Sequence, residues 1–135
     1  MAKVTFSSPE REFLRDNEVC RIATCHDKMP HVVPVSYVFD HDDVFFIATD
    51  YATRKYRNIK QNNNVALVVD VYSSIDNRAL CVQGRAEIIE TGQEFAKLYR
   101  IFYDRFEWVR HDPWEEGEAP FIKVIPTNKI SWCLT

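Results

Sequence analysis

Hydrophobic positions along the chain fall mainly into short runs with the two-residue period of β-strands, separated by clusters of turn-forming residues. In segment 31–39, one face is expected to carry Val33, Val35, Tyr37 and Phe39. The other face carries Val32, Pro34, Ser36 and Val38. Proline has no N–H for a strand ladder, so this strand is expected to be an edge, or irregular, at Pro34. Similar runs predict strands at 19–24, 44–49, 65–72, 79–89, 121–125 and 129–134.

Four of these strands carry more specific signals. The unbroken apolar run at 65–72 predicts burial on both faces of that strand. Gly84 lies in the middle of 79–89, where the missing side chain predicts a β-bulge or a close approach by another group. The last two strands are expected to be separate elements, because Pro126, Thr127 and Asn128 lie between them.

Helical signals occur at three places. A Ser7-Ser8-Pro9 start followed by Glu10 predicts a short helix near the N-terminus. Thr53 is a good cap for a helix over 54–61. Thr91 and Glu94 predict a capping box for a third helix. The apolar residues of this helix recur at helical spacing and are expected to form core or a dimer seam: Phe95, Leu98, Phe102 and Phe106.

The order of these elements predicts the fold class. Six or seven strands with mostly short connections, and helices inserted after the third and fifth strands, are typical of an antiparallel β-barrel of the α+β class with two or three flanking helices. A chain of 135 residues is expected to form a single domain, 1–135. Segment 108–119 contains Pro113 and Gly117, so we expect a surface loop there, long enough to cover the substrate end of a pocket.

Composition narrows the function classes. Hydrophobic residues make up 46% and charged residues 27% of the chain, as in soluble globular proteins. The balance of 17 basic against 20 acidic residues gives a net charge of -3, which argues against non-specific nucleic-acid binding. No apolar run approaches the ~20 residues of a membrane span, and the N-terminal segment lacks the apolar core of a signal peptide. We therefore expect no membrane partner and a cytoplasmic location.

The cysteines and histidines give no strong metal signal. Four cysteines occur without a CxxC pair and are expected to be reduced and packed as small hydrophobes: Cys20, Cys25, Cys81 and Cys133. Cys25, His26, Asp27 and His31 are close in sequence, but their spacing matches no zinc pattern. Segment 27–30 is instead typical of a hairpin turn, so no metal is expected. The glycine-rich nucleotide motifs GxGxxG and GxxxxGK[ST] are absent.

The helix over 54–61 is notable for its cationic first turn. Arg54, Lys55 and Arg57 lie where the helix dipole already places about half a positive charge. Backbone N–H groups at a helix start, the Thr53 hydroxyl and two fixed cations together make a suitable cradle for a phosphate group. The alternative is a solvated surface helix whose charges only keep the protein soluble.

These residues also carry a family resemblance. The run TDYATRKYRNIKQNNNVALVVD, preceded by HVVPVSYVFDHDDVFFIA and followed by VQGRAEII, resembles the FMN-binding split-barrel family that includes pyridoxamine 5'-phosphate oxidase. Its most specific part is T-R-K-x-x-N-I, an apolar strand, and then G-R-A-E. The segments PEREFLRDNEVCRIATC and APFIKVIPTNKISW are similar to the family's opening and closing elements, so the resemblance covers nearly the whole chain.

The resemblance implies positions for a bound FMN. Thr53, Arg54 and Lys55 would hold the phosphate, and Thr49 would contact the ribityl or phosphate region. Val33, Pro34, Val35 and Ser36 would lie along the flavin ring, mainly through backbone contacts. Asn58 belongs to the same pattern and is expected to be a local structural residue. In this family the flavin lies at a two-fold interface, which implies a homodimer whose partner supplies the segment at Arg78 and Ala79, and Trp132; Trp132 is equally expected as a core residue.

The resemblance implies a class of activity more than a reaction. We find no match to the longer C-terminal region with which pyridoxamine 5'-phosphate oxidase holds its vitamin substrate, since the sequence ends at Thr135. The leading expectation is an FMN-dependent oxidoreductase acting on a small organic substrate, with no side-chain nucleophile required. Alternatives are a deazaflavin-dependent reductase, a non-catalytic flavin- or haem-binding protein with axial ligands among His26, His31, His41 and His111, and a domain without a ligand.

Overall fold

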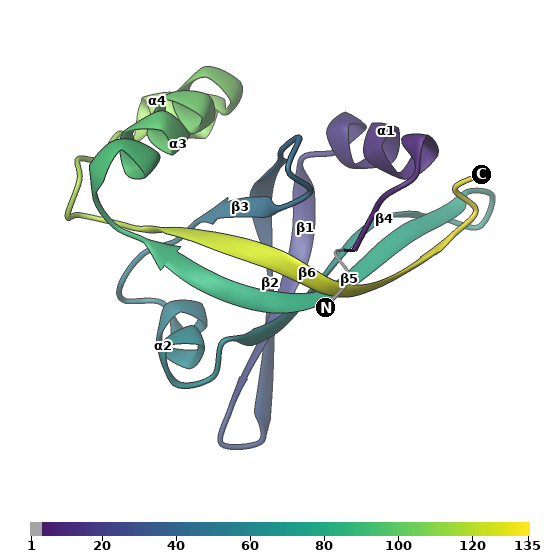
Figure 1. The fold of residues 1–135 in the computed structure, drawn as a ribbon, viewed down its shortest axis with the longest axis horizontal. Coiled ribbons are helices and arrows are strands. Elements are labelled where there is room, and N and C mark those ends of the chain that lie inside the picture. Colours follow the sequence, from purple (N-terminus) through teal and green to yellow (C-terminus); the bar gives the residue numbers. More distant parts are fainter. Residues whose placement is uncertain (1–3) are drawn as a thin grey trace.

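The computed structural model describes residues 4–135 and shows six antiparallel strands that close into an uneven ring in the order β1-β2-β3-β6-β5-β4, with helices around it (Figure 1). The strands are β1 (Val19–His26), β2 (Met29–Phe39), β3 (Phe45–Ala48), β4 (Asn64–Tyr72), β5 (Asn77–Ile89) and β6 (Phe121–Trp132). The helices are α1 (Ser8–Asp16), α2 (Arg54–Gln61), α3 (Gly92–Arg105) and α4 (Glu107–His111). The predicted α+β split barrel is therefore confirmed, with helices inserted after β3 and β5 as expected.

The ring is uneven because β2 changes neighbours along its length. It pairs with β1 from Ser36, opposite Val19, to Met29, opposite His26. Its pairing with β3 covers only Tyr37–Phe39. Within the described chain, residues 29–36 of β2 therefore lack a partner strand on their other side, and Pro34 lies in this open edge as predicted.

The C-terminal strand corrects one prediction. The two strands expected at 121–125 and 129–134 are one strand, β6, which pairs with β5 from Phe121 to Trp132. The register shifts at Gln83/Gly84, so that Asn128 faces Gln83 and Pro126 faces Gly84, leaving Thr127 as the extra residue of a bulge. A Cβ at Gly84 would lie 2.5 Å from the Ile125 carbonyl oxygen. The predicted bulge and the predicted close approach at Gly84 thus coincide, and they let the strand continue past Pro126.

Strand β4 corrects another prediction. Val65, Leu67 and Val69 are buried in the ring, but Ala66 and Val68 on the other face are only partly covered. Nothing in the described part of a single chain covers this outer face, so the apolar run at 65–72 is not buried on both sides. An apolar outer face of this kind is typical of a surface that another molecule covers.

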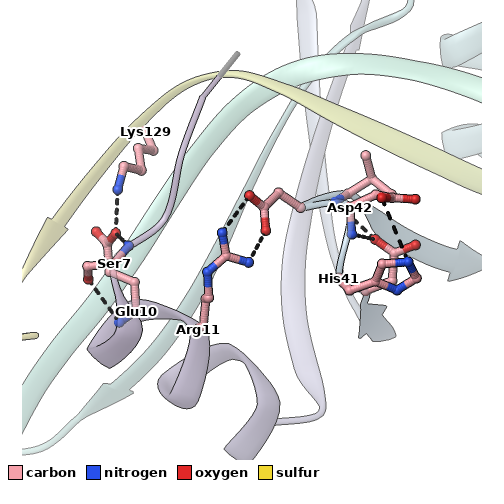
Figure 2. A network of polar contacts seen from close by, with 9 residues as sticks. Ser7, Glu10, Arg11, His41, Asp42 and Lys129 are labelled. Atoms are coloured by element: carbon pink, nitrogen blue, oxygen red, sulfur yellow. Dashed lines mark hydrogen bonds and ion pairs between the residues drawn. The ribbon is translucent and has the colours of Figure 1, made fainter.

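Helix α1 closes one end of the ring through polar contacts (Figure 2). Ser7 and Glu10 form the predicted capping box. The Glu10 carboxylate is buried and also accepts hydrogen bonds from Lys129 and Ser131 of β6. Arg11 of the same helix pairs with Asp43 in the turn between β2 and β3. These contacts attach α1 to two separate parts of the barrel.

Helices α3 and α4 cover a second apolar core outside the ring (Figure 1). The predicted stripe of Phe95, Leu98, Phe102 and Phe106 is buried there against Phe121, which confirms the core interpretation of this stripe. The predicted capping box is wrong, because the Thr91 side chain makes no cap hydrogen bond. Instead the carboxylate of Glu116 accepts from the Gly92 N–H. The segment expected as a loop from 108 begins with α4, which the short polar sequence did not signal.

The turn predicted between the first two strands is present in the structure. The hairpin between β1 and β2 turns at Asp27 and Lys28, both with positive φ, where a turn was predicted. No set of three or more metal-ligating side chains comes together within residues 4–135. No helix in this part of the chain combines the length and apolar character needed to cross a bilayer.

Candidate functional site

Helix α2 begins at Thr53, as the sequence predicted. The Thr53 hydroxyl accepts from the Tyr56 N–H at 3.2 Å and donates to the Asp50 carbonyl at 2.8 Å. Its oxygen also lies 3.1 Å from the hydroxyl of Thr49, which follows the end of β3. The fold therefore brings Thr49 and Thr53 together at the positive end of the helix dipole.

The exposed cations of α2 line a cavity of about 350 Å³ beside this helix start. Arg54, Arg57 and Lys60 contribute to its wall together with His26 of β1. No ion pair with an acidic residue involves these three cations anywhere in residues 4–135. The cationic cavity, as we call the space lined by His26, Arg54, Arg57 and Lys60, thus has an uncompensated positive charge.

Lys55 differs from its neighbours because it is buried, with 7% of its surface exposed. Burial lowers the pKa of Lys55 below its ordinary value. Burial also raises the pKa of Cys20 to about 12, so the thiol stays neutral and supplies no counterion. No ion pair of Lys55 is found among the described residues, and its Nζ is not one of the fully enclosed polar atoms without a partner, so the ammonium group still reaches solvent. A bound anion would offset part of the cost of burying the rest of this cation.

Asn58 is buried on the inner face of α2. Its amide Nδ2 donates to the hydroxyl of Thr24 on β1 at 3.0 Å. This contact attaches the helix to the barrel wall, which agrees with the expectation that Asn58 is a local structural residue. It also holds Lys55 and Arg54 in place at the helix start.

The four residues expected along the flavin ring lie on the open part of β2. Val33 and Val35 pack against the core inside the ring, whereas Pro34 and Ser36 lie on the other face. The Ser36 hydroxyl accepts a hydrogen bond from Trp108 Nε1 at 3.2 Å. The backbone edge of residues 29–36 remains free of strand pairing within the described chain, so it can bond a ligand with polar edges.

A second cavity, of about 380 Å³, has Thr49 in its wall. We call it the acidic cavity, since its wall includes Thr49, Asp50, Trp108, Asp112, Trp114 and Glu118. The rings of Trp108 and Trp114 are nearly parallel, with centroids 6.1 Å apart. Sequence reasoning expected segment 108–119 to cover a pocket but assigned no residue in it. The available signal was the presence of two tryptophans in an otherwise polar segment.

Trp114 has one unusual feature. Its indole Nε1 is buried and has no hydrogen-bond partner in the described structure. An unsatisfied buried donor costs about 1–3 kcal/mol. A ligand that brings an acceptor atom to this N–H would recover that cost.

Trp132 is not brought to these cavities within one chain. It lies at the far end of β6 from α2 (Figure 1), opposite Ala79, and its Nε1 donates to Asn77 at 2.8 Å. Its exposed fraction is 40%, so it is not a core residue. Arg78, on the same β5 end, pairs with Asp76 and lies over the Phe13 ring. A role for Trp132 at the flavin therefore requires a second copy of the chain.

The outer face of the ring is apolar over several strands. In register across β2, β1 and β4, Val32 faces Ala23, and Ala23 faces Ala66. On β6, Ile130 lies opposite Cys81 of β5, and Cys81 is opposite Val68. Val32 and Ile130 are each 64% exposed. Such an exposed apolar sheet face suits burial against another protein surface.

The fold is that of a split-barrel protein with a cationic helix start directly after β3. The sequence profile of the pyridoxamine 5'-phosphate oxidase family matches residues 9–133. The chain belongs to this family, as the resemblance implied.

Individual relatives extend the comparison. The chain is 35% identical over 95 residues to a 5a,11a-dehydrotetracycline/5a,11a-dehydrooxytetracycline reductase from Streptomyces rimosus. That match covers 64% of this chain and 66% of the reductase, slightly less than two thirds of the relative's length. Two solved structures share the fold at lower identity. A FAD-binding protein from Mesorhizobium loti has a TM-score of 0.74 at 21% identity, covering 97% of this chain and 96% of its own. The haem storage protein HutZ from Vibrio cholerae has a TM-score of 0.78 at 16% identity, covering 91% and 92%.

Proposed function

We propose that the protein is an FMN-dependent oxidoreductase of the pyridoxamine 5'-phosphate oxidase family that transfers hydride or electrons to or from a small organic substrate. The observation that carries the proposal is the buried and unpartnered Lys55 at the start of a helix whose other cations are also free of acidic partners in the described chain. A phosphate group supplies the missing negative charge there.

The residues of this site fit a flavin mononucleotide. Thr53, Arg54 and Lys55 would bind its phosphate, and Thr49 extends the same polar surface through its contact with Thr53. The unpaired edge of β2 at Val33, Pro34, Val35 and Ser36 offers backbone groups to the polar edge of a flavin ring. Bound flavin supplies the hydride and electron chemistry. The role of the chain is to hold the cofactor and to shape its surroundings.

The reductase relative favours an enzyme over a carrier. Its name describes a reductase acting on dehydrotetracyclines, and it shares appreciable sequence identity with this chain. Only the class of reaction is carried over to this chain, because the match covers 66% of that protein. We propose reduction of a small organic compound on this basis.

We further propose that the active form is a homodimer with the cofactor between subunits. The apolar outer face with Val32 and Ile130 gives a surface that a second copy would cover. A dimer would also bring Trp132 and the Arg78–Ala79 segment of one chain toward the open edge of β2 in its partner. This arrangement would complete a site that one chain leaves open along β2.

A visible spectrum of the purified protein, followed by titration with FMN, tests the cofactor. We expect the oxidised flavin bands, FMN binding, and bleaching of these bands by NADH or NADPH followed by reoxidation with an added acceptor. A Soret band would indicate haem instead, and a deazaflavin would show its own absorption. Flavin that binds but is never reduced by either nucleotide would indicate a carrier and contradict the enzyme proposal.

A further inference from the structure

The two cavities beside Thr49 and Thr53 have opposite charge. The cationic cavity has Arg54, Arg57 and Lys60 in its wall and no acidic residue. The acidic cavity has Asp50, Asp112 and Glu118 and no lysine, arginine or histidine. Thr49 lines the acidic cavity and contacts the capping Thr53, and the next residue, Arg54, lines the cationic cavity.

This separation of charge assigns different ligands to the two cavities. A phosphate group is attracted to the cationic cavity and repelled by three carboxylates. No ion pair in the described residues neutralises Asp50, Asp112 or Glu118. The acidic cavity is therefore free to accept a part of a ligand that carries positive charge.

The aromatic walls add a preference for shape. The indole rings of Trp108 and Trp114 stack on each other, with an angle of 10° between their planes and 6.1 Å between their centroids, and both rings line the cavity. Indole faces attract flat rings and organic cations through their π-electron quadrupole. The Nε1 of Trp114 is fully enclosed and has no partner in the described chain.

Trp108 also connects the acidic cavity to the expected flavin position. Its Nε1 donates to Ser36, one of the β2 residues that the family resemblance assigns to the flavin ring. A compound held against Trp108 would lie next to the strand that carries Ser36. The acidic cavity is thus suitably placed for the substrate of a flavin reaction.

We infer that the acidic cavity binds planar, conjugated organic compounds that carry a protonated amine, and that these are the substrate class of the enzyme. The indole rings of Trp108 and Trp114 receive the flat part of the compound, and Asp50, Asp112 and Glu118 attract its ammonium group. That these compounds are substrates rests on the proposed flavin function. The binding preference itself follows from the cavity alone.

Three probes with the same naphthalene ring test the preference: naphthylethylammonium, naphthylethanol and naphthylpropionate. Each is titrated by calorimetry into the flavin-loaded wild-type protein at low ionic strength. We expect the ammonium compound to bind about tenfold more tightly than the carboxylate, with the alcohol between them. Equal affinities for the ammonium compound and the carboxylate would overturn the inference.

Two charge-matched variants locate the effect. Asp112→Asn removes a carboxylate from the acidic cavity and should weaken binding of the ammonium probe about threefold to fivefold, with little change for the alcohol. Asp104→Asn makes the same chemical change on α3, outside the wall of this cavity, and should leave both affinities unchanged. An equal effect of the two variants would overturn the inference.

FMN affinity is measured in the same preparations, so each of the two proposals can be contradicted without the other. Loss of the ammonium preference with normal FMN binding contradicts only the substrate class. A protein that keeps the ammonium preference but does not bind FMN contradicts the proposed function and leaves the cavity preference standing.

Discussion

Trp108 of α4 and Ser36 of β2 are joined by a hydrogen bond of 3.2 Å, although 72 positions separate them in the sequence. The contact attaches the segment after α3 to the open edge of the barrel. It makes one continuous surface from β2, where the flavin is expected, to the acidic cavity. Its position explains why α4 belongs to the candidate site although its own sequence carries no known motif.

The phosphate site is tested by removing the two cations at the start of α2. We expect Arg54→Ala with Lys55→Ala to weaken FMN binding by about two orders of magnitude or more, because each charge-assisted contact contributes roughly 1.5–3 kcal/mol. Flavin fluorescence titration measures the affinity. The control is Lys97→Ala with Arg100→Ala, which removes the same charges from α3 and should leave the affinity unchanged. Wild-type affinity in the first variant would show that the phosphate binds elsewhere.

Lys55 should stabilise the cofactor complex while destabilising the flavin-free protein. Lys55→Met keeps about the same side-chain volume but removes the buried charge. The free energy of unfolding without flavin should therefore rise by about 1 kcal/mol or more. Lys60→Met, on the exposed side of α2, should change it by less than about 0.5 kcal/mol. Chemical denaturation measures both. A less stable Lys55→Met protein would contradict the absence of a partner for Lys55.

The effect of Lys55→Met should also depend on pH. Because burial lowers the pKa of Lys55, the unfolded chain binds this proton more tightly than the folded chain does. The wild type therefore regains stability as pH rises from the lowered pKa toward the ordinary value. The stability difference between the variant and the wild type should shrink over that range.

Glu10 predicts the acid sensitivity of the fold. Burial alone would raise its pKa, but hydrogen bonds from Lys129, Ser131 and the Ser7 N–H outweigh burial and lower the pKa from 4.5 to about 2. Its contribution of roughly 3 kcal/mol is present above pH 4.5 and is lost as pH falls toward 2. Glu10→Gln should remove this pH dependence, whereas Glu12→Gln, exposed on the same helix, should retain it. Denaturation midpoints of both variants, measured from pH 4.5 down to about pH 2, show whether the pH dependence is lost in Glu10→Gln and kept in Glu12→Gln.

The bulge at Gly84 predicts that any side chain at this position destabilises the fold. In Gly84→Ala the new Cβ would lie 2.5 Å from the Ile125 carbonyl oxygen, so β5 and β6 must separate locally. We expect a loss of about 1–3 kcal/mol in the free energy of unfolding. Gln83→Ala, at the exposed neighbour, should cost much less. A Gly84→Ala protein as stable as the wild type would show that the bulge relaxes without cost.

The proposed dimer is tested on the outer face of the ring. Val32→Glu with Ile130→Glu places two charges on the apolar surface and should shift the protein toward monomer at micromolar concentration, with weaker FMN binding. Ile75→Glu makes the same kind of change in the turn between β4 and β5, where Ile75 is 95% exposed, and should leave the mass unchanged. Light scattering after size exclusion measures the mass. A monomeric wild type would contradict the proposal.

Local sequence signals were reliable where the physics is local. Thr53 predicted the start of α2, because a cap bond forms within a single turn. Ser7 and Glu10 predicted the capping box of α1 for the same reason. At Thr91 the same signal failed, because Glu116 from a distant segment accepts from the Gly92 N–H in its place.

The continuity of β6 could not be predicted from its own residues. Pro126 and the two polar residues after it are typical of a turn, but the bulge opposite Gly84 accommodates them within one strand. The burial of 65–72 was wrong for a related reason. An apolar run shows that a surface should be covered, and only the tertiary structure shows that Ala66 and Val68 face outward from the ring.

The sequence by itself determined the family, the cationic start of α2 and most of the strands and helices, apart from the continuity of β6 and the short helix α4, since these depend on residue types at short spacing. The tertiary structure decided that Lys55 is buried without a partner in the described chain while Arg54 stays exposed. It also decided that Trp108 contacts Ser36, and that Thr49 lines an acidic cavity while Arg54 lines a basic one. Burial and long-range contact depend on how distant segments pack, which residue spacing along one segment does not encode.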